Sequence, residues 1–421
     1  MTRDDCLALD AQDPLAPLRA QFTIPPALIY LDGNSLGALP RATGARLRQV
    51  IDHEWGTDLI RSWNSAGWME LPRKVGDKIA RLIGARPGEV IAADSTSVNL
   101  YKVLSAALLL QRANPGRRRI VSERSNFPTD LYIAESLARE RGSDLVLAEA
   151  ENIPALIDER LAVLMLTEVN YRSGALHDMA ALALQARQAG ALSVWDLAHS
   201  AGVLPLDLHA AQADFAIGCG YKYLNGGPGA PAFLWVHPRH LERMQHEDLW
   251  QPLAGWIGHA APFEFTPHYV PAGGIARYQC GTPQILGLTA LECGVDTVLA
   301  AEPFGGVPAL RAKSLALTRL FARLVDECCA DQGLSLVTPQ DERRRGSQIS
   351  LARDEGAYAI VQALIERGVI GDFRAPDVLR FGFAPLYTRF IDVWNAVEQL
   401  RQVLAGGFWR EARFAERRAV T

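Results

Sequence analysis

The sequence contains few of the features that mark membrane, secreted or nucleic-acid-binding proteins. No apolar run approaches the roughly 18 residues that span a bilayer, and the acidic first residues hold no apolar segment typical of a signal peptide. The formal net charge is −4 and no block of basic residues occurs, which argues against nucleic acid as a partner. The six cysteines form no CxxC pair and no zinc-ligand spacing. We therefore expect a cytoplasmic protein without a metal site, a membrane anchor or a disulfide framework.

The length of 421 residues suits two or three domains, and the apolar pattern divides the chain into two parts. From about residue 85, helical patterns separate short apolar runs at 90–93, 119–122, 144–148, 161–166, 191–195, 213–218 and 231–236. Continuous apolar strands that alternate with helices indicate a mostly parallel sheet, buried on both faces. From about residue 296, helical stretches at 306–329, 355–367 and 389–404 alternate with shorter strands, which predicts a smaller α/β domain.

One lysine lies where chemistry is expected. Lys222 stands between the apolar strand at 213–218 and a glycine-rich turn at 225–229, among aromatic and small residues. A lysine that its neighbours desolvate has a lowered pKa and offers the neutral amine that imine formation requires. The alternative is an ordinary surface lysine on a loop, which is what most lysines are. The residues that follow the other strands favour the chemical role.

An acid and a histidine follow the strand at 191–195, at the end of the sheet where ligands of parallel sheets bind. A carboxylate at Asp196 is suited to hold a proton on a pyridine nitrogen, because the paired charge favours the protonated ring. Its alternative role is to cap the next helix. His199 lies three residues further on and can meet the same ligand.

The strands at 90–93 and 119–122 are followed by an anion site and a stacking residue. Thr96 and Ser97 open a helix whose N-terminus suits an anion, although a plain helix cap is the alternative. Phe127 can stack on a flat heteroaromatic ring, and Asp130 can cap the next helix or bond a ring substituent. An anion site, a stacking ring, a carboxylate for a ring nitrogen and an imine-forming lysine together predict pyridoxal phosphate (PLP) as the cofactor.

Six motifs of the chain resemble those of the kynureninase family. They lie at 32–37, 127–130, 195–199, 221–225, 255–259 and 379–387, and read DGNSLG, FPTD, WDLAH, YKYLN, GWIGH and LRFGFAPLY. The resemblance runs from about residue 25 to about residue 405. It implies an α/β, aspartate-aminotransferase-like fold (PLP fold type I) whose large domain, at 51–295, contains a mostly parallel seven-stranded sheet. It also implies a small C-terminal domain at 296–421, an N-terminal segment at 1–50 that packs with it, and a homodimer with active sites at the interface.

The resemblance assigns roles to residues at matching positions. It implies that Lys222 is the Schiff-base lysine and that Tyr221 and Asp196 are also catalytic. The cofactor-binding residues that it implies are Thr96, Ser97, Phe127, Asp130, Thr167, Asp196, His199, Tyr221 and Lys222, with Trp256 and Thr282 from the second subunit. For the substrate, it implies that Arg380 binds the α-carboxylate and that Ser35 and Trp63 line the pocket of the aromatic end.

The activity that the resemblance implies is PLP-dependent hydrolysis of L-kynurenine to anthranilate and L-alanine, in tryptophan degradation. Animal members of the family carry His at the Trp63 position and Asn at the Thr282 position. This chain differs from them and resembles bacterial members, which favours kynurenine over 3-hydroxykynurenine as the substrate.

Two alternatives of other kinds remain at this point. One is a cysteine desulfurase, which needs a mobile nucleophilic cysteine on a loop, whereas Cys328 and Cys329 lie in a predicted helix. The other is a regulator that uses the fold as a sensor, although no basic helix-turn-helix segment precedes residue 25.

Overall fold

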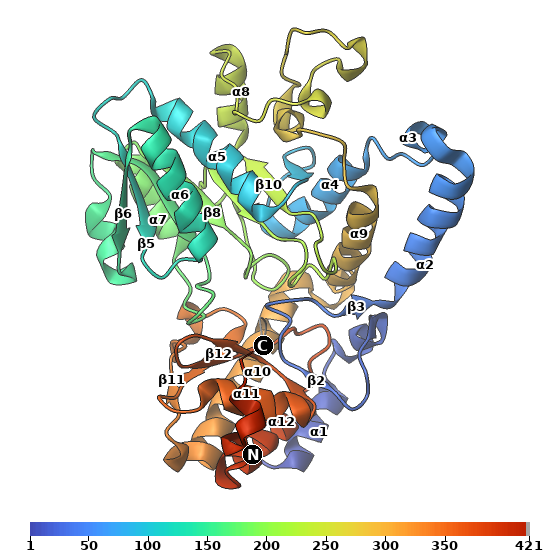
Figure 1. Ribbon diagram of the computed structural model, residues 1–421, viewed down its shortest axis with the longest axis vertical. Helices are drawn as coiled ribbons and strands as arrows, with labels where there is room; N and C mark the ends of the chain where they lie inside the picture. Colours follow the sequence, from blue (N-terminus) through green and yellow to red (C-terminus); the bar gives the residue numbers. More distant parts are fainter. Residues whose placement is uncertain (418–421) are drawn as a thin grey trace.

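The computed structural model describes residues 1–417, which fold around two sheets (Figure 1). The larger sheet has seven strands in the order β4-β10-β9-β8-β7-β5-β6. Its strands are β4 (Val90–Ala92), β5 (Arg119–Glu123), β6 (Asp144–Ala148), β7 (Leu161–Thr167), β8 (Leu192–Asp196), β9 (Phe215–Gly218) and β10 (Phe233–Val236). All neighbours pair in parallel except β10, which runs antiparallel to both β4 and β9. The predicted mostly parallel sheet of seven strands is therefore confirmed.

Helices cover both faces of this sheet. Because successive strand residues point to opposite sides, the residues of each strand pack into two different apolar clusters. Ile120, Val163 and Val194 pack in one apolar cluster with α5 (Thr96–Gln111) and α6 (Pro128–Arg141). Their neighbours Val121, Leu164 and Trp195 pack in another. That second cluster includes residues of α4 (Leu71–Ile83), α7 (Met179–Gln188) and α9 (Ile285–Leu299). This double burial explains why the strands read as continuous apolar runs.

The smaller sheet lies below the larger one in Figure 1 and is antiparallel, in the order β11-β12-β15-β14. Its strands are β11 (Ser335–Leu336), β12 (Gln348–Ala352), β14 (Asp372–Arg374) and β15 (Val378–Gly382). The helices α10 (Gly306–Cys329), α11 (Ala357–Glu366) and α12 (Phe390–Ala405) share an apolar core with it.

The first part of the chain packs against this smaller unit. The helix α1 (Arg3–Gln12) lies on α12, and Asp10 accepts hydrogen bonds from the backbone nitrogens of Phe390 and Ile391 at 2.7 and 3.0 Å. The short strand β2 (Ile29–Tyr30) pairs in parallel with β13 (Val369–Ile370). These contacts place the turn at residues 32–37 between the two sheets.

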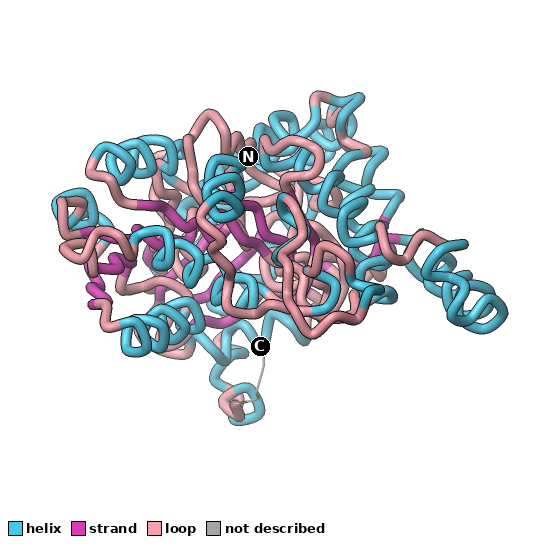
Figure 2. Tube along the Cα trace, turned by 90° about the horizontal axis from the view of Figure 1, so that it is seen from above, coloured by secondary structure: helices cyan, strands magenta, loops and turns pink. Residues whose placement is uncertain are grey.

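A helical arm projects from the side of the molecule, as Figures 1 and 2 show. It consists of α2 (Arg41–Gln49), a wider helical turn over Val50–Asp58, a 3-10 turn over Leu59–Arg61 and α3 (Ser62–Ser65). The arm exposes four large apolar side chains, at Ile51, Trp55, Leu59 and Ile60. Within residues 1–417, no helix is both long and apolar enough to cross a bilayer.

Candidate functional site

A cavity of about 230 Å³ lies at the carboxyl ends of the parallel strands, as expected for this sheet type. Thr167 ends β7, Asp196 ends β8, and Phe127 follows β5 at the start of α6. The predicted site residues that line the cavity are Thr96, Ser97, Phe127, Asp130, Thr167, Asp196, His199, Tyr221 and Lys222. The structure thus brings together nine of the predicted residues within one chain.

One end of the cavity is formed by the N-terminus of α5. Ser95 caps this helix by accepting a hydrogen bond from the backbone nitrogen of Val98, while Thr96 and Ser97 form the first turn. Asp94 precedes the cap in a left-handed conformation with φ 52° and is held by the fully buried Lys102, whose Nζ lies 2.6 Å from its Oδ2. The free backbone N–H groups of a helix start and its positive dipole end suit an anion such as a phosphate.

Two buried carboxyl groups lie deeper in the cavity. Burial raises the pKa of Asp196, and burial together with the negative charge of Asp196 raises the pKa of Asp130 well above its ordinary range. Asp196 accepts a hydrogen bond from the backbone nitrogen of Ala198 at 2.8 Å, and Thr167 donates to Asp130 at 3.4 Å. Two adjacent carboxylates cannot both stay ionised without a positive partner, so this end of the cavity suits a protonated ring nitrogen.

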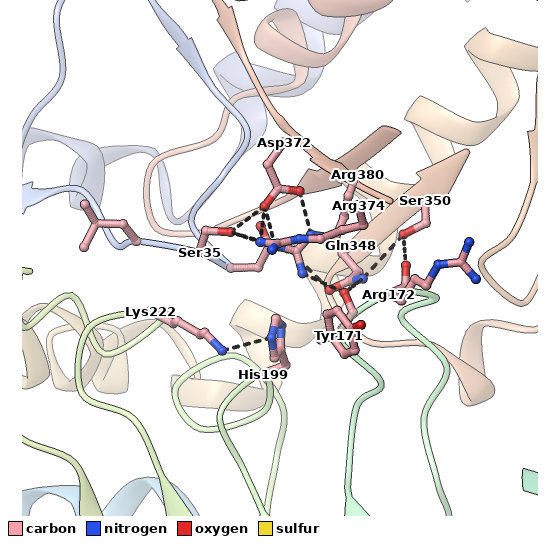
Figure 3. A network of polar contacts seen from close by, with 12 residues as sticks. Ser35, Tyr171, Arg172, His199, Lys222, Gln348, Ser350, Asp372, Arg374 and Arg380 are labelled. Atoms are coloured by element: carbon pink, nitrogen blue, oxygen red, sulfur yellow. Dashed lines mark hydrogen bonds and ion pairs between the residues drawn. The ribbon is translucent and has the colours of Figure 1, made fainter. Parts of the chain in front are cut away.

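Lys222 reaches the same cavity from the loop that follows β9. Its Nζ lies 3.0 Å from Nε2 of His199 (Figure 3). Burial, and next the positive charge of Lys222, lower the pKa of His199 well below its ordinary value, so the imidazole is neutral at pH 7. The Nδ1 atom of His199 is buried and has no hydrogen-bond partner among the described residues. Lys222 is half-buried and forms part of the cavity wall.

The loop that carries Lys222 is braced by the turn at residues 32–37. Asn225 and Gly227 adopt positive φ angles of 56° and 85°, which turn the chain back after the lysine. The backbone nitrogen of Gly37 donates to the Tyr221 carbonyl at 2.7 Å. Burial raises the pKa of the Tyr221 phenol, so it is a neutral proton donor at pH 7.

Phe127 and Tyr171 form an aromatic wall of the cavity. Phe127 is 41% exposed, and its ring meets that of Tyr171 edge-on, with centroids 5.3 Å apart and an interplanar angle of 88°. A flat heteroaromatic ligand can stack on such a partly exposed ring.

Arg380 and Ser35 lie together beside the cavity, although 345 residues separate them in the chain. The Nη2 atom of Arg380 lies 2.6 Å from the Ser35 hydroxyl, and its Nη1 donates to the Tyr171 carbonyl at 2.6 Å. Arg380 also makes a two-point contact with Asp372, with its Nε 2.8 Å from Oδ1 and its Nη2 on Oδ2. The predicted carboxylate-binding arginine is therefore buried within a polar network that joins β14, β15 and the turn at 32–37.

Five predicted residues do not line the cavity of their own chain. Ser35 and Arg380 belong to the polar network beside it, and Trp63, Trp256 and Thr282 lie apart from that network. Trp63 lies on the helical arm and packs edge-on against Trp68, with ring centroids 5.7 Å apart. Trp256 is 41% exposed and donates to the Pro262 carbonyl, and Thr282 is exposed beside a separate hollow. The assignment of Trp256 and Thr282 to a second subunit stays a prediction, as does the placement of Trp63 at the substrate.

Sequence reasoning missed four residues that shape the site: Lys102, Tyr171, Asp372 and Arg374. Tyr171 follows β7 closely, so the rule that located Asp196 and Phe127 could have found it. Asp372 and Arg374 alternate on the short strand β14 six to eight residues before Arg380, and charged residues on a buried strand indicate pairing. Lys102 is the one charged residue of α5, a largely buried helix, which indicates a buried partner.

The polarity of the cavity fits PLP, the cofactor predicted from the sequence. The cavity combines an anion site at one end, a pair of buried acids with raised pKa values, an aromatic wall, and an amine beside a neutral imidazole. The unpartnered Nδ1 of His199 offers a further polar contact to a ligand in this space.

Comparison with known proteins agrees with this fit. A family model described as the kynureninase C-terminal domain matches residues 310–400. Kynureninases of Pseudomonas fluorescens and Burkholderia pseudomallei (strain 1106a) are each 55% identical to the chain over 424 residues, and each alignment covers 100% of both sequences. A cysteine desulfurase of Thermococcus onnurineus NA1 superposes with a TM-score of 0.76 and 18% identity, over 93% of this chain and 98% of its own.

A second solved structure, a C-DES mutant with glycine covalently linked to its PLP cofactor, superposes with a TM-score of 0.77. It is 15% identical and the match covers 91% of this chain and 98% of its own. Identities this low inform about the fold alone, and the predicted aspartate-aminotransferase-like fold is confirmed by these likenesses to PLP-enzyme structures. The identity of 55% over the full length goes further: the chain belongs to the kynureninase family.

Proposed function

We propose that this protein hydrolyses L-kynurenine to anthranilate and L-alanine with PLP as its cofactor. The observation that carries this proposal is the single cavity in which Lys222 and the acid pair Asp130 and Asp196 face the N-terminus of α5. The 55% identity to kynureninases supports the choice of substrate among the reactions that such a cavity can host.

The residues of the large sheet hold the cofactor in this proposal. Thr96 and Ser97 bind its phosphate with the first N–H groups of α5, and Phe127 covers one face of its ring. Asp196, with Asp130 behind it, keeps a proton on the ring nitrogen, since the buried carboxylates gain a positive partner. When bound, PLP withdraws electrons from the bonds at the substrate Cα.

Two groups near the cavity move protons. Lys222 takes the proton from the substrate Cα, because its Nζ lies in the cavity wall, 3.0 Å from Nε2 of His199. Water adds to the γ-carbonyl of kynurenine before the Cβ–Cγ bond breaks. Tyr221, whose phenol stays protonated, donates the proton that the departing β-carbon of alanine needs.

The substrate is held from the other side of the cavity. Arg380 binds the α-carboxylate, a task that suits the planar guanidinium. Ser35 and Trp63 are proposed to line the space for the aromatic end, with kynurenine as the main substrate and 3-hydroxykynurenine as a second one. Tryptophan degradation and the supply of NAD precursors are the settings that this activity implies, and we expect the enzyme in the cytoplasm.

A homodimer with active sites at the interface is part of the proposal. Trp256 is 41% exposed and Thr282 is exposed, as expected for residues that reach the phosphate bound by a partner. The apolar residues of the helical arm, such as Trp55 at 57% and Ile60 at 76% exposure, offer further surface for a second copy. We retain the domain boundaries 1–50, 51–295 and 296–421 in this proposal.

The positions of the cysteines disfavour the desulfurase alternative. Cys328 and Cys329 lie at the end of α10 in the smaller unit, and none of the six cysteines lines the cavity. Cys219, which is nearest in sequence to Lys222, is buried, and burial raises the pKa of its thiol. A buried thiol of raised pKa is a poor nucleophile.

The deciding experiment mixes the purified protein with PLP and L-kynurenine and follows the fluorescence of anthranilate. We expect anthranilate and L-alanine in equal amounts, and sulfide release from L-cysteine at background level. Absence of anthranilate from protein that binds PLP would refute the function, and rapid sulfide release would replace it with desulfurase activity.

A further inference from the structure

Two arginines share a single ionised acid beside the cavity. Asp372 accepts hydrogen bonds from Arg380 at its Nε and Nη2, from Arg374 at 2.6 Å and from Ser35 at 2.7 Å. Burial opposes the ionisation of Asp372, but the two guanidinium groups outweigh it and lower its pKa. Figure 3 shows Ser35, Arg374 and Arg380 converging on Asp372, away from the pair formed by Lys222 and His199.

The charge balance of this cluster depends on Arg374. The charge of Arg380 is offset by Asp372, and the next acid, Asp32, has its pKa raised to about 8 by burial and by the charge of Asp372. Asp32 is therefore mostly uncharged at pH 7. Arg374 supplies the surplus positive charge, and without it the cluster would be neutral and a poor site for an anion.

The two arginine side chains differ in their exposure and in how many of their nitrogens already donate hydrogen bonds to the protein. The Arg380 side chain is only 1% exposed, and all three of its nitrogens donate hydrogen bonds to protein groups. The Arg374 side chain is 34% exposed, and its buried Nε has no hydrogen-bond partner among the described residues. A buried donor without a partner is costly unless a ligand or water pairs with it.

Arg374 contacts the same hydroxyl group as Arg380, because its Nη2 donates to Ser35 at 3.2 Å. Burial and Lys222 dominate the lowered pKa of His199, and the charges of Arg380 and Arg374 lower it further. Burial raises the pKa of the Tyr221 phenol most, and the positive charge of Arg374 lowers this pKa by a smaller amount. The shared contact with Ser35 places Arg374 next to the guanidinium group that is assigned to the substrate carboxylate.

We propose that Arg374 is a second substrate-binding arginine, which binds the α-carboxylate of the amino-acid substrate together with Arg380 while Asp372 holds both guanidinium groups in place. This inference rests on the proposed function, because it assigns a role at the substrate end of that site. Arg374 contributes the net positive charge and free N–H groups, and Arg380 contributes a fixed position.

The rival explanation gives Arg374 a structural role, in which it only braces Asp372 and so keeps Arg380 in place. The two explanations differ in what they predict for a ligand without a carboxylate. Loss of a carboxylate contact weakens only ligands that carry the carboxylate, whereas a disordered site weakens all of them.

The experiment compares ligands and variants of the PLP-loaded enzyme. Arg374→Gln should raise KM for L-kynurenine about 10- to 100-fold and change kcat by less than about 3-fold, the range expected for loss of one charge-assisted contact. Binding of L-alanine, followed by the visible spectrum of the cofactor, should weaken by a similar factor. Binding of kynuramine, the analogue without the carboxylate, should stay within about 3-fold of the wild type.

Arg172→Gln is the matched control. Arg172 lies between the same two parts of the chain, is 35% exposed, and forms an ion pair of 2.6 Å with Asp377 away from the cavity. We expect its KM to stay at the wild-type value. Arg374→Lys keeps the charge and should recover part of the affinity, and it takes the place of Arg374→Gln if that variant does not fold.

Three results would overturn the inference. An unchanged KM in Arg374→Gln would show that Arg374 does not contact the carboxylate. An equal weakening of kynuramine binding would assign Arg374 a structural role. An equal rise of KM in Arg172→Gln would show that the effect is not specific to the position of Arg374. A wild type that releases no anthranilate would instead refute the proposed function, while its binding of L-alanine would still report on Arg374.

Discussion

Asp32 should control how substrate affinity depends on pH. Its pKa is raised to about 8 by burial and by the negative charge of Asp372, against the opposing charge of Arg380. The carboxyl is then about one-tenth ionised at pH 7 and about nine-tenths ionised at pH 9. The proton is bound below pH 8 and lost above it, so the net charge of the four groups Asp32, Arg374, Arg380 and Asp372 changes from +1 to zero. The carboxylate of the substrate should therefore bind less tightly as the pH rises through 8.

The size of the effect follows from one added charge. At an effective dielectric constant of about 20 and a separation of about 8 Å, two unit charges interact by about 2 kcal/mol, or roughly 30-fold in affinity. Salt screens such a buried interaction weakly. The other titratable groups that face Asp32 remain neutral, because burial holds their pKa values above the ordinary range; they are Tyr30, Tyr223 and Tyr387.

The assay is KM for L-kynurenine from pH 6.5 to 9.5 at constant ionic strength, in the wild type and in Asp32→Asn. Between pH 7 and pH 9 we expect KM of the wild type to rise about 10- to 30-fold more than that of the variant. Near pH 7 the two values should agree within about 3-fold, because Asp32 is then mostly protonated. Titration of the substrate amine affects both proteins equally. Parallel profiles across the whole range would refute the charge assigned to Asp32.

Three further substitutions test the cofactor side of the site. Lys222→Ala should abolish turnover and the visible absorbance of the bound cofactor, and an unchanged spectrum would contradict its role as the amine that bonds PLP. Asp196→Asn should retain PLP but lower kcat by about 10²- to 10³-fold, since a fixed charge is lost, and near-normal turnover would exclude that role. Gly37→Ala would press a new Cβ against the Lys222 carbonyl and Asn225, and should lower kcat/KM by roughly 10²-fold through misplacement of the loop. Gly44→Ala, with nothing within 4 Å of the new Cβ, is its control, and equal losses in both would contradict the steric explanation.

The strands and helices could be predicted because their burial requires apolar residues at regular positions in the local sequence. The run at 144–148 became β6 and the stretch at 306–329 became α10 with the same bounds, since both are bordered by residues that end apolar runs. The end of each parallel strand then located Asp196, Phe127 and Lys222, because strand ends of a parallel sheet meet at one edge. Each of these predictions needs only the local pattern and one rule of topology.

The substrate end of the site could not be predicted in the same way. Ser35 contacts Arg380 across 345 residues, and no periodicity reports a contact of that separation. Arg380 and Ser35 were placed at the substrate only by the resemblance to a family, and Asp372 and Arg374 escaped notice because the resemblance assigned them no role. Trp63 shows the limit of that transfer, since it lies on an arm outside the cavity of its own chain.

The cofactor and the substrate are held by different parts of the chain. The cavity is lined only by residues between Asp94 and Gln284, whereas the arginine cluster comes from the turn at 32–37 and from β14 and β15. Tyr171 joins the two parts directly, since it forms part of the cavity wall and its carbonyl accepts from Arg380, and the hydrogen bond from Gly37 to the Tyr221 carbonyl is a second link. Substitutions in the smaller unit should therefore change substrate affinity while the spectrum of the bound cofactor stays the same. This separation allows a failure of substrate binding to be told apart from a failure of the cofactor site.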